Sequence, residues 1–143
     1  MSRVTVSDGC SETVPEINHG AHEVITNYEY DGAFYDRERR DFFGFKTVTT
    51  TFADGTYIVD EYCNREYYLK GAVEKSCSYA KDGTVFSIHT AEYCDAPCAL
   101  TAKEENWTYE KASRNSDCIH TVARYDYDGY GNCTRVTQDF GDG

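Results

Sequence analysis

The stretch TVTTTFADGTYIVDEYC, residues 47–63, decides the fold class. Residues 47–53 are rich in threonine and valine, and residues 56–63 carry tyrosine, isoleucine and valine, all of which favour extended backbone. Asp54-Gly55 lies between the two runs, and both residue types tolerate the positive φ angles of a tight hairpin turn. The stretch therefore predicts two antiparallel strands joined by a short turn.

Further Asp-Gly pairs lie inside similar stretches, and the dipeptide occurs six times in the chain. SCSYAKDGTVFSIHT predicts strands over residues 76–80 and 84–90. TVARYDYDGYGNCTRVTQDF predicts strands over residues 121–127 and 133–140 around a turn. AHEVITNYEYDGAFYD, residues 21–36, is a looser fourth candidate. Hairpins in series predict a broad sheet whose outer strands need closure, a covering layer or neighbouring sheet from more chain.

Composition supports the same fold class. The chain has 143 residues with 13 tyrosines and seven phenylalanines, whereas leucine occurs only at Leu69 and Leu100. Aromatic residues and threonine favour strands. No low-complexity linker or shift in composition divides the chain. We expect an all-β, antiparallel, hairpin-rich fold that forms a single β module over residues 1–143.

The segment TAKEENWTYEKASRN, residues 101–115, is ambiguous. Its helix formers and the Thr-x-x-Glu pattern at Thr101 and Glu104 are typical of a helix N-terminus. Trp107, Thr108 and Tyr109 favour a strand instead. The sequence leaves open one short helix near residues 101–113.

The charge excludes some partners. The formal net charge is −11 and the isoelectric point is about 4.7, so the surface repels phosphate backbones and nucleic acid is not expected as a partner. No apolar run approaches the roughly 20 residues of a membrane-spanning helix. Residues 1–10 lack the apolar core of a signal peptide. We expect a protein that is secreted or associated with the cell surface, without a recognisable signal peptide in this chain.

Seven cysteines are many for a chain of this length: Cys10, Cys63, Cys77, Cys94, Cys98, Cys118 and Cys133. The odd number leaves at least one thiol unpaired within the chain, while an oxidising compartment allows up to three disulfides. Cys94, Cys98, Cys118 and His120 are chemically able to form a zinc site. Their spacing departs from the commonest pattern, so we favour free thiols or a disulfide from Cys94 or Cys98 to Cys118. No metal or other cofactor is expected.

The stretch ARYDYDGYGNC, residues 123–133, has three interpretations. Tyr125 and Tyr127 place both rings on one face of a strand, Asp128 can accept bonds from backbone amides of its turn, and Gly129 and Gly131 supply positive φ angles. These properties favour a structural repeat. Exposed tyrosines would also suit carbohydrate binding. A calcium loop is disfavoured because no closing glutamate follows the acidic residues.

Three segments, in this order, resemble a known family. Residues 28–48, YEYDGAFYDRERRDFFGFKTV, resemble a segment of the B component of insecticidal toxin complexes, and the matching residues are Tyr28, Tyr30, Tyr35, Asp36, Arg40, Asp41, Phe42, Gly44 and Phe45. Residues 61–87 are similar to the next hairpin of that family through Tyr68, Lys70, Gly71, Tyr79, Asp82 and Gly83. Residues 125–143 resemble a YD repeat of Rhs proteins through Tyr125, Tyr127, Asp128, Gly131 and Asn132.

The resemblance implies a fragment-like piece of a long antiparallel sheet that spirals into a hollow shell around a toxic polypeptide. It implies a structural, virulence-associated role without enzyme activity, and its partners are the polypeptide cargo or neighbouring sheet of a longer parent chain. No catalytic residue is expected, since no Gly-x-Ser-x-Gly or other activating context occurs.

The chain departs from the family in its cysteine density and in lacking the autoproteolytic aspartate-proline-glycine motif. It is also far too short to close a shell by itself. Two alternatives stay open. One is a secreted module that binds carbohydrate or protein through exposed tyrosines, and the other is a small zinc-stabilised β domain.

Overall fold

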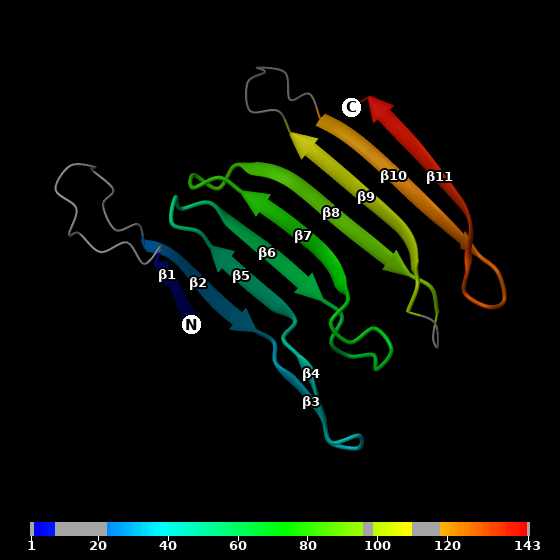
Figure 1. The fold of residues 1–143 in the computed structure, drawn as a ribbon, viewed down its shortest axis with the longest axis horizontal. Coiled ribbons are helices and arrows are strands. Elements are labelled where there is room, and N and C mark those ends of the chain that lie inside the picture. The colour runs from blue at the N-terminus through cyan, green and yellow to red at the C-terminus, as the bar shows by residue number, and fades with distance from the viewer. Residues whose placement is uncertain (1, 8–22, 96–98, 110–117, 143) are drawn as a thin grey trace.

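The computed structural model describes residues 2–7, 23–95, 99–109 and 118–142, which form strands and no helix (Figure 1). The strands are β1 (Ser2–Ser7), β2 (Glu23–Asp31), β3 (Phe34–Asp36), β4 (Asp41–Gly44), β5 (Thr47–Thr51), β6 (Tyr57–Tyr62), β7 (Val73–Tyr79), β8 (Val85–Tyr93), β9 (Thr101–Tyr109), β10 (Cys118–Tyr127) and β11 (Cys133–Asp142). The predicted all-β, antiparallel fold class is confirmed. Within these residues there is no helix of the length and hydropathy that crossing a membrane requires.

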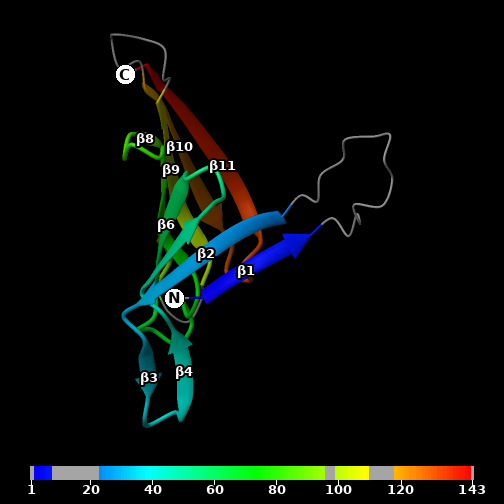
Figure 2. The same ribbon diagram turned by 90° about the vertical axis from the view of Figure 1, so that its left-hand side faces the viewer.

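Nine strands form one sheet in the order β1-β2-β5-β6-β7-β8-β9-β10-β11, and all neighbouring pairs are antiparallel. The other two strands, β3 and β4, pair with each other in a separate hairpin that interrupts the chain between β2 and β5. This hairpin projects from one end of the large sheet (Figures 1 and 2). β1 and β11 are the outer strands of the large sheet.

The three clearest predicted hairpins are confirmed, because β5 pairs with β6, β7 with β8, and β10 with β11. The looser hairpin over residues 21–36 is wrong. β2 pairs with β1 and β5, whereas β3 pairs with β4. Gly32, with φ +67°, lets the chain leave the sheet after β2, and Lys46 N–H then donates to the carbonyl oxygen of Asp31 at 3.0 Å as the chain returns into β5.

The short helix considered near residues 101–113 is not formed in the described part of that range, since Thr101–Tyr109 is strand β9. β9 pairs with β8 on one side and with β10 on the other. A ladder of hydrogen bonds on both sides outweighs the modest helix preference of its glutamates and lysine. Residues 110–113 lie outside the described residues.

The large sheet is a single layer with little core of its own. Across the described part of the chain, the buried apolar side chains are Phe43, Cys63, Cys77, Ala80 and Val122, and Asn64 is the buried polar one. Most other strand residues are half-buried or exposed. A sheet normally buries at least one face against a second layer. This sheet therefore leaves two broad faces with few covered side chains.

Strand register assigns side chains to the two faces. One unbroken row of paired residues crosses eight strands: Tyr30, Val48, Asp60, Ser76, His89, Asn106, Thr121 and Phe140. Paired residues share a face, and so do residues two apart along a strand. We call the face with Tyr30 and Thr121 the repeat face, and the face with Cys77, Trp107 and His120 the opposite face.

Candidate functional site

Two pairs of tyrosines, one on β2 and one on β10, lie on the repeat face, although five strands separate β2 from β10 in the sheet. Tyr28 and Tyr30 are on β2, and their ring centroids are 6.4 Å apart. Tyr125 and Tyr127 are on β10, and the hydroxyl of Tyr125 donates to Glu104 on β9 at 2.8 Å. The sequence predicted the shared face within each segment. That the two segments share one face depends on every turn and bulge between them.

Two tyrosines fasten strand ends in the same way, and we call each contact a tyrosine clamp. Tyr93, the last residue of β8, donates its hydroxyl to the carbonyl oxygen of Val73, the first residue of β7, at 2.7 Å. Tyr127, the last residue of β10, donates to the carbonyl oxygen of Thr101, the first residue of β9, at 2.7 Å. Burial raises the pKa of both hydroxyls, so they keep the donated proton at neutral pH.

The three Asp-Gly hairpins share one turn chemistry. In each, an aspartate Oδ1 accepts a hydrogen bond from the backbone N–H two residues later: Asp54 from Thr56 at 2.9 Å, Asp82 from Thr84 at 3.0 Å, and Asp128 from Tyr130 at 2.9 Å. Each loop has three residues and ends in a left-handed glycine, which is Gly55 (φ +87°), Gly83 (+85°) or Gly131 (+86°). In the first hairpin the loop is one residue longer than the Asp54-Gly55 turn that the sequence indicated.

The aspartate of the third turn lies two residues earlier, relative to its loop, than the aspartates of the other two turns. Asp128 precedes its loop, and its carboxylate accepts from Asn132 through both the backbone N–H at 2.9 Å and the side-chain amide at 3.0 Å. The side-chain bond from Asn132 is the main cause that holds the pKa of Asp128 below its usual value. The left-handed residue is Gly131, and Gly129 is not among the glycines with positive φ, so that part of the prediction is wrong.

The Tyr28–Phe45 segment divides into two parts. Tyr30 packs against Phe45, with ring centroids 4.8 Å apart, and Phe45 meets Phe42 edge-on at 5.5 Å. These rings continue the row that begins with Tyr28. Gly44, with φ +92°, turns the chain between Phe42 and Phe45. That these residues act as a structural repeat is still a prediction.

The second part is the turn of the projecting hairpin. Asp36 Oδ1 accepts from the backbone N–H groups of Glu38 at 2.9 Å and Arg39 at 3.2 Å, and Arg40 has a left-handed backbone with φ +54°. Tyr35 is 54% exposed. The run RERR, residues 37–40, forms the turn, because Asp36 holds the backbone amides of Glu38 and Arg39.

Asn64 is a structural residue that sequence reasoning missed. It is 2% exposed, and its side-chain amide donates to the carbonyl oxygens of Gly32 at 2.8 Å and Gly44 at 3.3 Å. It therefore joins the two points where the projecting hairpin leaves and re-enters the sheet. A hollow of about 440 Å³ lies beside it, and Lys46 and Glu74 form an ion pair at its wall.

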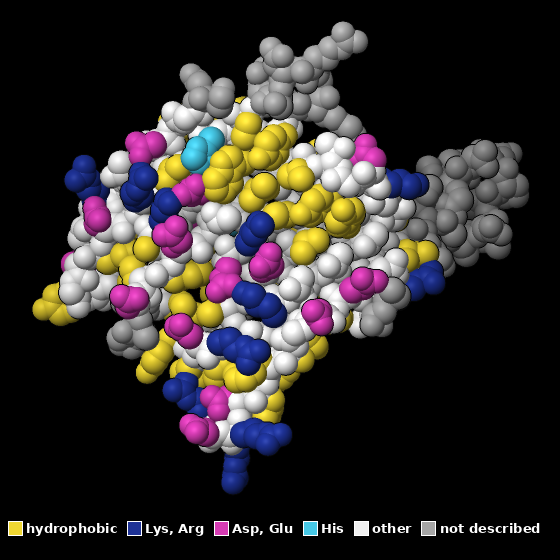
Figure 3. All heavy atoms as spheres, turned by 180° about the vertical axis from the view of Figure 1, so that it is seen from behind, with side chains coloured by type: hydrophobic (Ala, Val, Ile, Leu, Met, Phe, Trp, Pro, Cys, Tyr) yellow, Lys and Arg dark blue, Asp and Glu magenta, His cyan; other side chains and the backbone are white. Residues whose placement is uncertain are grey.

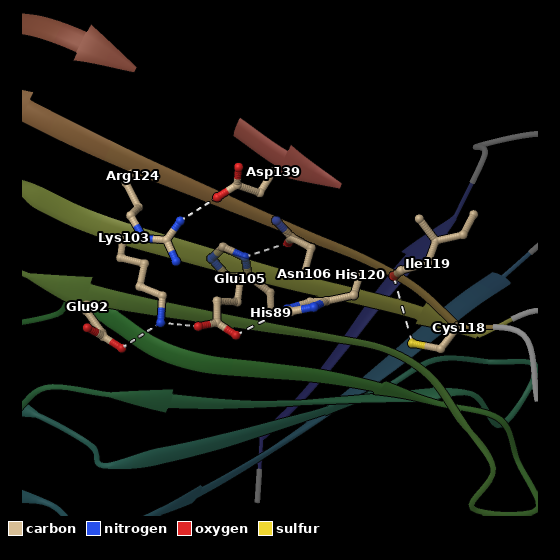
Figure 4. A network of polar contacts seen from close by, with 10 residues as sticks. All are labelled: His89, Glu92, Lys103, Glu105, Asn106, Cys118, Ile119, His120, Arg124 and Asp139. Carbon is tan, nitrogen blue, oxygen red and sulfur yellow. Dashed lines mark hydrogen bonds and ion pairs between the residues drawn. The ribbon is translucent and has the colours of Figure 1, made fainter. Parts of the chain in front are cut away.

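A network of polar contacts crosses β8 to β11 (Figure 4). Lys103 forms ion pairs with Glu105 and, at 3.4 Å, with Glu92. Glu105 Oε2 lies 3.3 Å from Nε2 of His120, whose ring stacks on Trp107 at 4.7 Å. Two further contacts are Arg124 with Asp139 at 2.6 Å and His89 with Asn106 at 2.7 Å.

The electrostatics of this network are those of cross-strand ion pairing. The hydrogen bond from Lys103 is the main cause that lowers the pKa of Glu105, and the same bond raises the pKa of Lys103. Both side chains therefore stay charged at neutral pH. The two described histidines contact an amide, a carboxylate and an indole ring.

The proposed zinc ligands are not brought together. Cys94 follows the end of β8, and Cys118 begins β10. Tyr93 pairs with Thr101 and Cys118 pairs with Tyr109, so the two cysteines lie at opposite ends of β9, roughly 26 Å apart by strand rise. That separation rules out a shared zinc ion or a disulfide between them.

Among the described residues, no three histidine, cysteine or acidic side chains lie close enough together to hold a metal ion. The described thiols, at Cys63, Cys77, Cys94, Cys118 and Cys133, are free. His120 lies beside Glu105 and Trp107. Cys98 lies outside the described residues.

These features define a class of protein: a single-layer antiparallel sheet of successive hairpins with tyrosine clamps and two open outer strands. The chain belongs to the family described as the insecticide toxin TcdB middle/N-terminal region, whose model matches residues 1–76. The resemblance to toxin-complex proteins that the sequence indicated is therefore confirmed.

Solved structures have the same fold. The crystal structure of TcdB2-TccC3 matches 81% of this chain with a TM-score of 0.62 at 14% identity. The structure of TcdB2-TccC3 without the hypervariable C-terminal region matches 81% with a TM-score of 0.61 at 14% identity, and that of TcdB2-TccC3-TEV gives 0.60 at 13%. The chain spans only 9% of the length of these matched chains. No curated protein sequence matches it.

Proposed function

We propose that this chain is a non-catalytic wall segment of a toxin-complex-type shell and that it helps to enclose a toxin polypeptide. The observation that supports this most directly is the single-layer, nine-stranded sheet with few buried side chains. Such a sheet is incomplete as a compact domain, since it lacks a covering layer within the described residues. It is well suited to continue into more sheet at both outer strands.

The outer strands carry apolar side chains that suit a larger assembly. On the repeat face, Val4 and Val6 of β1 are 47% and 60% exposed, and Val136 and Phe140 of β11 are 57% and 72% exposed. Apolar side chains on both outer strands favour contact with further protein on the same side of the sheet. In the proposed shell, that protein is neighbouring wall or the enclosed polypeptide.

The mechanism is confinement and not covalent chemistry. Hairpins with tyrosine clamps hold the strands in register, and backbone groups of the outer strands pair with adjoining sheet of a longer parent chain. TcdB2-TccC3, which shares the fold, is a far larger protein, of whose chain this segment matches 9%. We further propose that the tyrosine-aspartate segments act as YD repeats of the Rhs type, and that the protein acts in virulence as part of a secreted toxin.

Sedimentation velocity of the 143-residue chain over a range of concentrations tests the wall assignment. We expect reversible association, because each outer strand can pair with another copy. Val136→Lys combined with Phe140→Lys places two charges on β11 and is expected to shift association to higher concentration. The matched control, Phe52→Lys with Tyr130→Lys, puts the same charges at hairpin turns and is expected to associate like the parent.

A monomer at every concentration would contradict the wall assignment. A soluble monomer that also gives a reproducible glycan-array signal would point instead to a carbohydrate-binding module. Loss of that signal on substitution of exposed tyrosines would complete the case for binding.

A further inference from the structure

The projecting hairpin and a neighbouring connection form what we call the basic lobe: residues 34–44, comprising β3, β4 and their turn, and residues 64–71 between β6 and β7. The lobe stands clear of the large sheet (Figures 1 and 2). Dark-blue lysine and arginine side chains gather on this end of the molecule in Figure 3.

The charge of the lobe differs from that of the rest of the chain. It holds five basic and four acidic side chains, whereas the other residues hold nine basic and 21 acidic ones. Surface charges are screened beyond a Debye length of about 8 Å at physiological ionic strength. Because the lobe projects from the sheet (Figure 2), a partner that touches only the lobe meets a surface with a small excess of basic side chains, and not the strongly acidic remainder of the chain.

Internal contacts fix the shape of the lobe. Lys70 Nζ lies 2.6 Å from Asp41 Oδ2, which ties the connection to β4. The guanidinium carbon of Arg39 lies 4.6 Å from the centre of the Tyr67 ring, and that of Arg65 lies 4.2 Å from the centre of the Phe34 ring. These contacts cross from the hairpin to the connection. They hold the lobe in one arrangement before any partner arrives, which lowers the entropic cost of binding.

The lobe contains an open hollow of about 540 Å³, lined by Arg39, Arg40, Asp41, Tyr67 and Tyr68. Tyr67 is 48% exposed and Tyr68 is 53% exposed. Asp41 is already paired with Lys70, so its charge is largely compensated. Among the described residues Arg40 forms no ion pair, and its left-handed backbone is a strained conformation for arginine.

We propose that this hollow is a docking site for a short acidic segment of a partner polypeptide. Arginine presents a planar fork of donors that matches a carboxylate, and tyrosine and arginine are the residues most enriched where interfaces concentrate binding energy. The hollow thus offers carboxylate recognition beside two exposed rings. The partner carries acidic side chains in one segment and is not strongly acidic as a whole.

Other occupants fit less well. A long polyanion such as nucleic acid would extend from the lobe over the acidic remainder of the chain, where it is repelled. A second copy of the chain has open backbone groups to pair with at the outer strands, and at the lobe it would bring a net charge of −11 close to the acidic remainder of the first copy. A short segment reaches the hollow without either penalty. This site does not depend on the proposed shell, because neither outer strand contributes a residue to the hollow.

Fluorescence anisotropy with a labelled, glutamate-rich peptide that contains tyrosine tests the proposal on the 143-residue chain, at concentrations where the chain is monomeric. We expect binding that weakens as salt is added, and no binding of the same peptide with glutamine in place of glutamate. Arg39→Glu combined with Arg40→Glu is expected to weaken binding by about tenfold, because two ion pairs become repulsive. The matched control is Lys81→Glu with Arg135→Glu, which changes the net charge equally and is expected to alter binding by less than about threefold.

Amide chemical-shift mapping by NMR gives a readout that needs no variant, and shifts are expected to cluster in residues 36–41 and 67–70. Equal weakening by both double variants, equal binding of the glutamine peptide, or shifts spread along the sheet would overturn the proposal. Tighter binding of a long sulfated polyanion, lost in the Arg39→Glu, Arg40→Glu variant, would assign the lobe to polyanions instead. Self-association that the same variant abolishes would assign it to a second copy.

Discussion

The hydroxyl of Tyr127 at the end of β10 donates to the carbonyl oxygen of Thr101 at the start of β9, at 2.7 Å. The YD-like tyrosine therefore fastens its strand to the preceding strand, β9, rather than to β11, which follows its own turn. Tyr93 makes the same contact with Val73, where it closes the open end of the β7–β8 hairpin. A contact of this type, repeated along a long sheet, would tie the end of one strand to the start of the strand before it and help to fix their register.

Tyr127→Phe tests the energetic value of a clamp. The substitution keeps the ring and removes the bond to Thr101, so we expect a loss of about 1 kcal/mol in the free energy of unfolding. Denaturant unfolding with an unchanged slope provides the measurement. Tyr130→Phe is the matched control, since Tyr130 is 94% exposed, and it is expected to change stability by less than about 0.5 kcal/mol. Equal effects of the two substitutions would contradict the clamp.

Asp128 predicts how stability responds to acid. Its pKa is lowered in the folded state, chiefly by the side-chain bond from Asn132, so its stabilising contribution is present above the unfolded aspartate pKa of about 3.9 and is lost as pH falls through the lower folded value. We expect Asp128→Asn to be less stable than the parent at neutral pH and the two to converge at low pH.

Thermal unfolding between neutral pH and acid, followed by circular dichroism, measures this convergence. Asp126→Asn, in an exposed position on the preceding strand, is the control and is expected to keep the parent stability at neutral pH within about 0.5 kcal/mol. A gap between Asp128→Asn and the parent that stays constant down to low pH would refute the assigned role of the carboxylate.

Substitution of Asn64 tests how much its two hydrogen bonds to Gly32 and Gly44 stabilise the protein. Asn64→Ala leaves two carbonyl oxygens without their donor in a buried position, and we expect a loss of about 2 kcal/mol in the free energy of unfolding. Asn64→Asp is expected to be worse at neutral pH, because a buried carboxylate faces two carbonyl oxygens. It is expected to recover in acid, where a protonated carboxyl can donate. Glu66→Gln, on the exposed side, should leave stability unchanged. Recovery in acid that is no greater for Asn64→Asp than for Asn64→Ala would contradict this account.

Local patterns predicted the parts of the fold that local chemistry determines. The hairpins at Asp54, Asp82 and Asp128 were predictable because each turn uses its own aspartate and glycine. Strand β9 was not, since its state depends on two neighbouring strands that outweigh the helix preference of its own residues. The wrong hairpin over residues 21–36 has the same cause, because β5 returns from the projecting hairpin to pair with β2.

For the candidate sites too, the sequence predicted what local spacing determines and missed contacts between residues distant along the chain. The tyrosines of the repeat face were identified from their spacing, but the partners of Tyr93 and Tyr127 lie in other strands and could not be. Asn64 carries no sequence signal that distinguishes it from a surface asparagine. In the sequence the basic lobe shows only as the basic run of residues 37–40. Its shape depends on contacts with Tyr67 and Lys70, which lie in a connection distant along the chain.

In the YD-like hairpin the left-handed glycine is Gly131 and not Gly129 of the Asp-Gly pair, and this distinguishes it from the other two hairpins. Substitutions at both glycines test the difference. Gly131 has φ +86°, and a Cβ there would meet Leu100 Cδ1 at an ordinary 3.6 Å, so backbone strain alone opposes a side chain. We expect Gly131→Ala to lower the free energy of unfolding by about 1–2 kcal/mol. Gly129 has open space around it and no positive φ, so Gly129→Ala is expected to be neutral or to stabilise by up to about 1 kcal/mol.

Chemical denaturation of both variants separates the two hairpin types. A two-residue Asp-Gly turn would make Gly129 the intolerant position, because both of its central residues need positive φ. A three-residue loop that ends in the Gly-Asn pair makes Gly131 the intolerant one, and Gly131→Asn is then expected to cost less than Gly131→Ala, since asparagine adopts the left-handed region more readily. A larger loss for Gly129→Ala than for Gly131→Ala would mean that the Asp-Gly pair, and not the Gly-Asn pair, turns the chain.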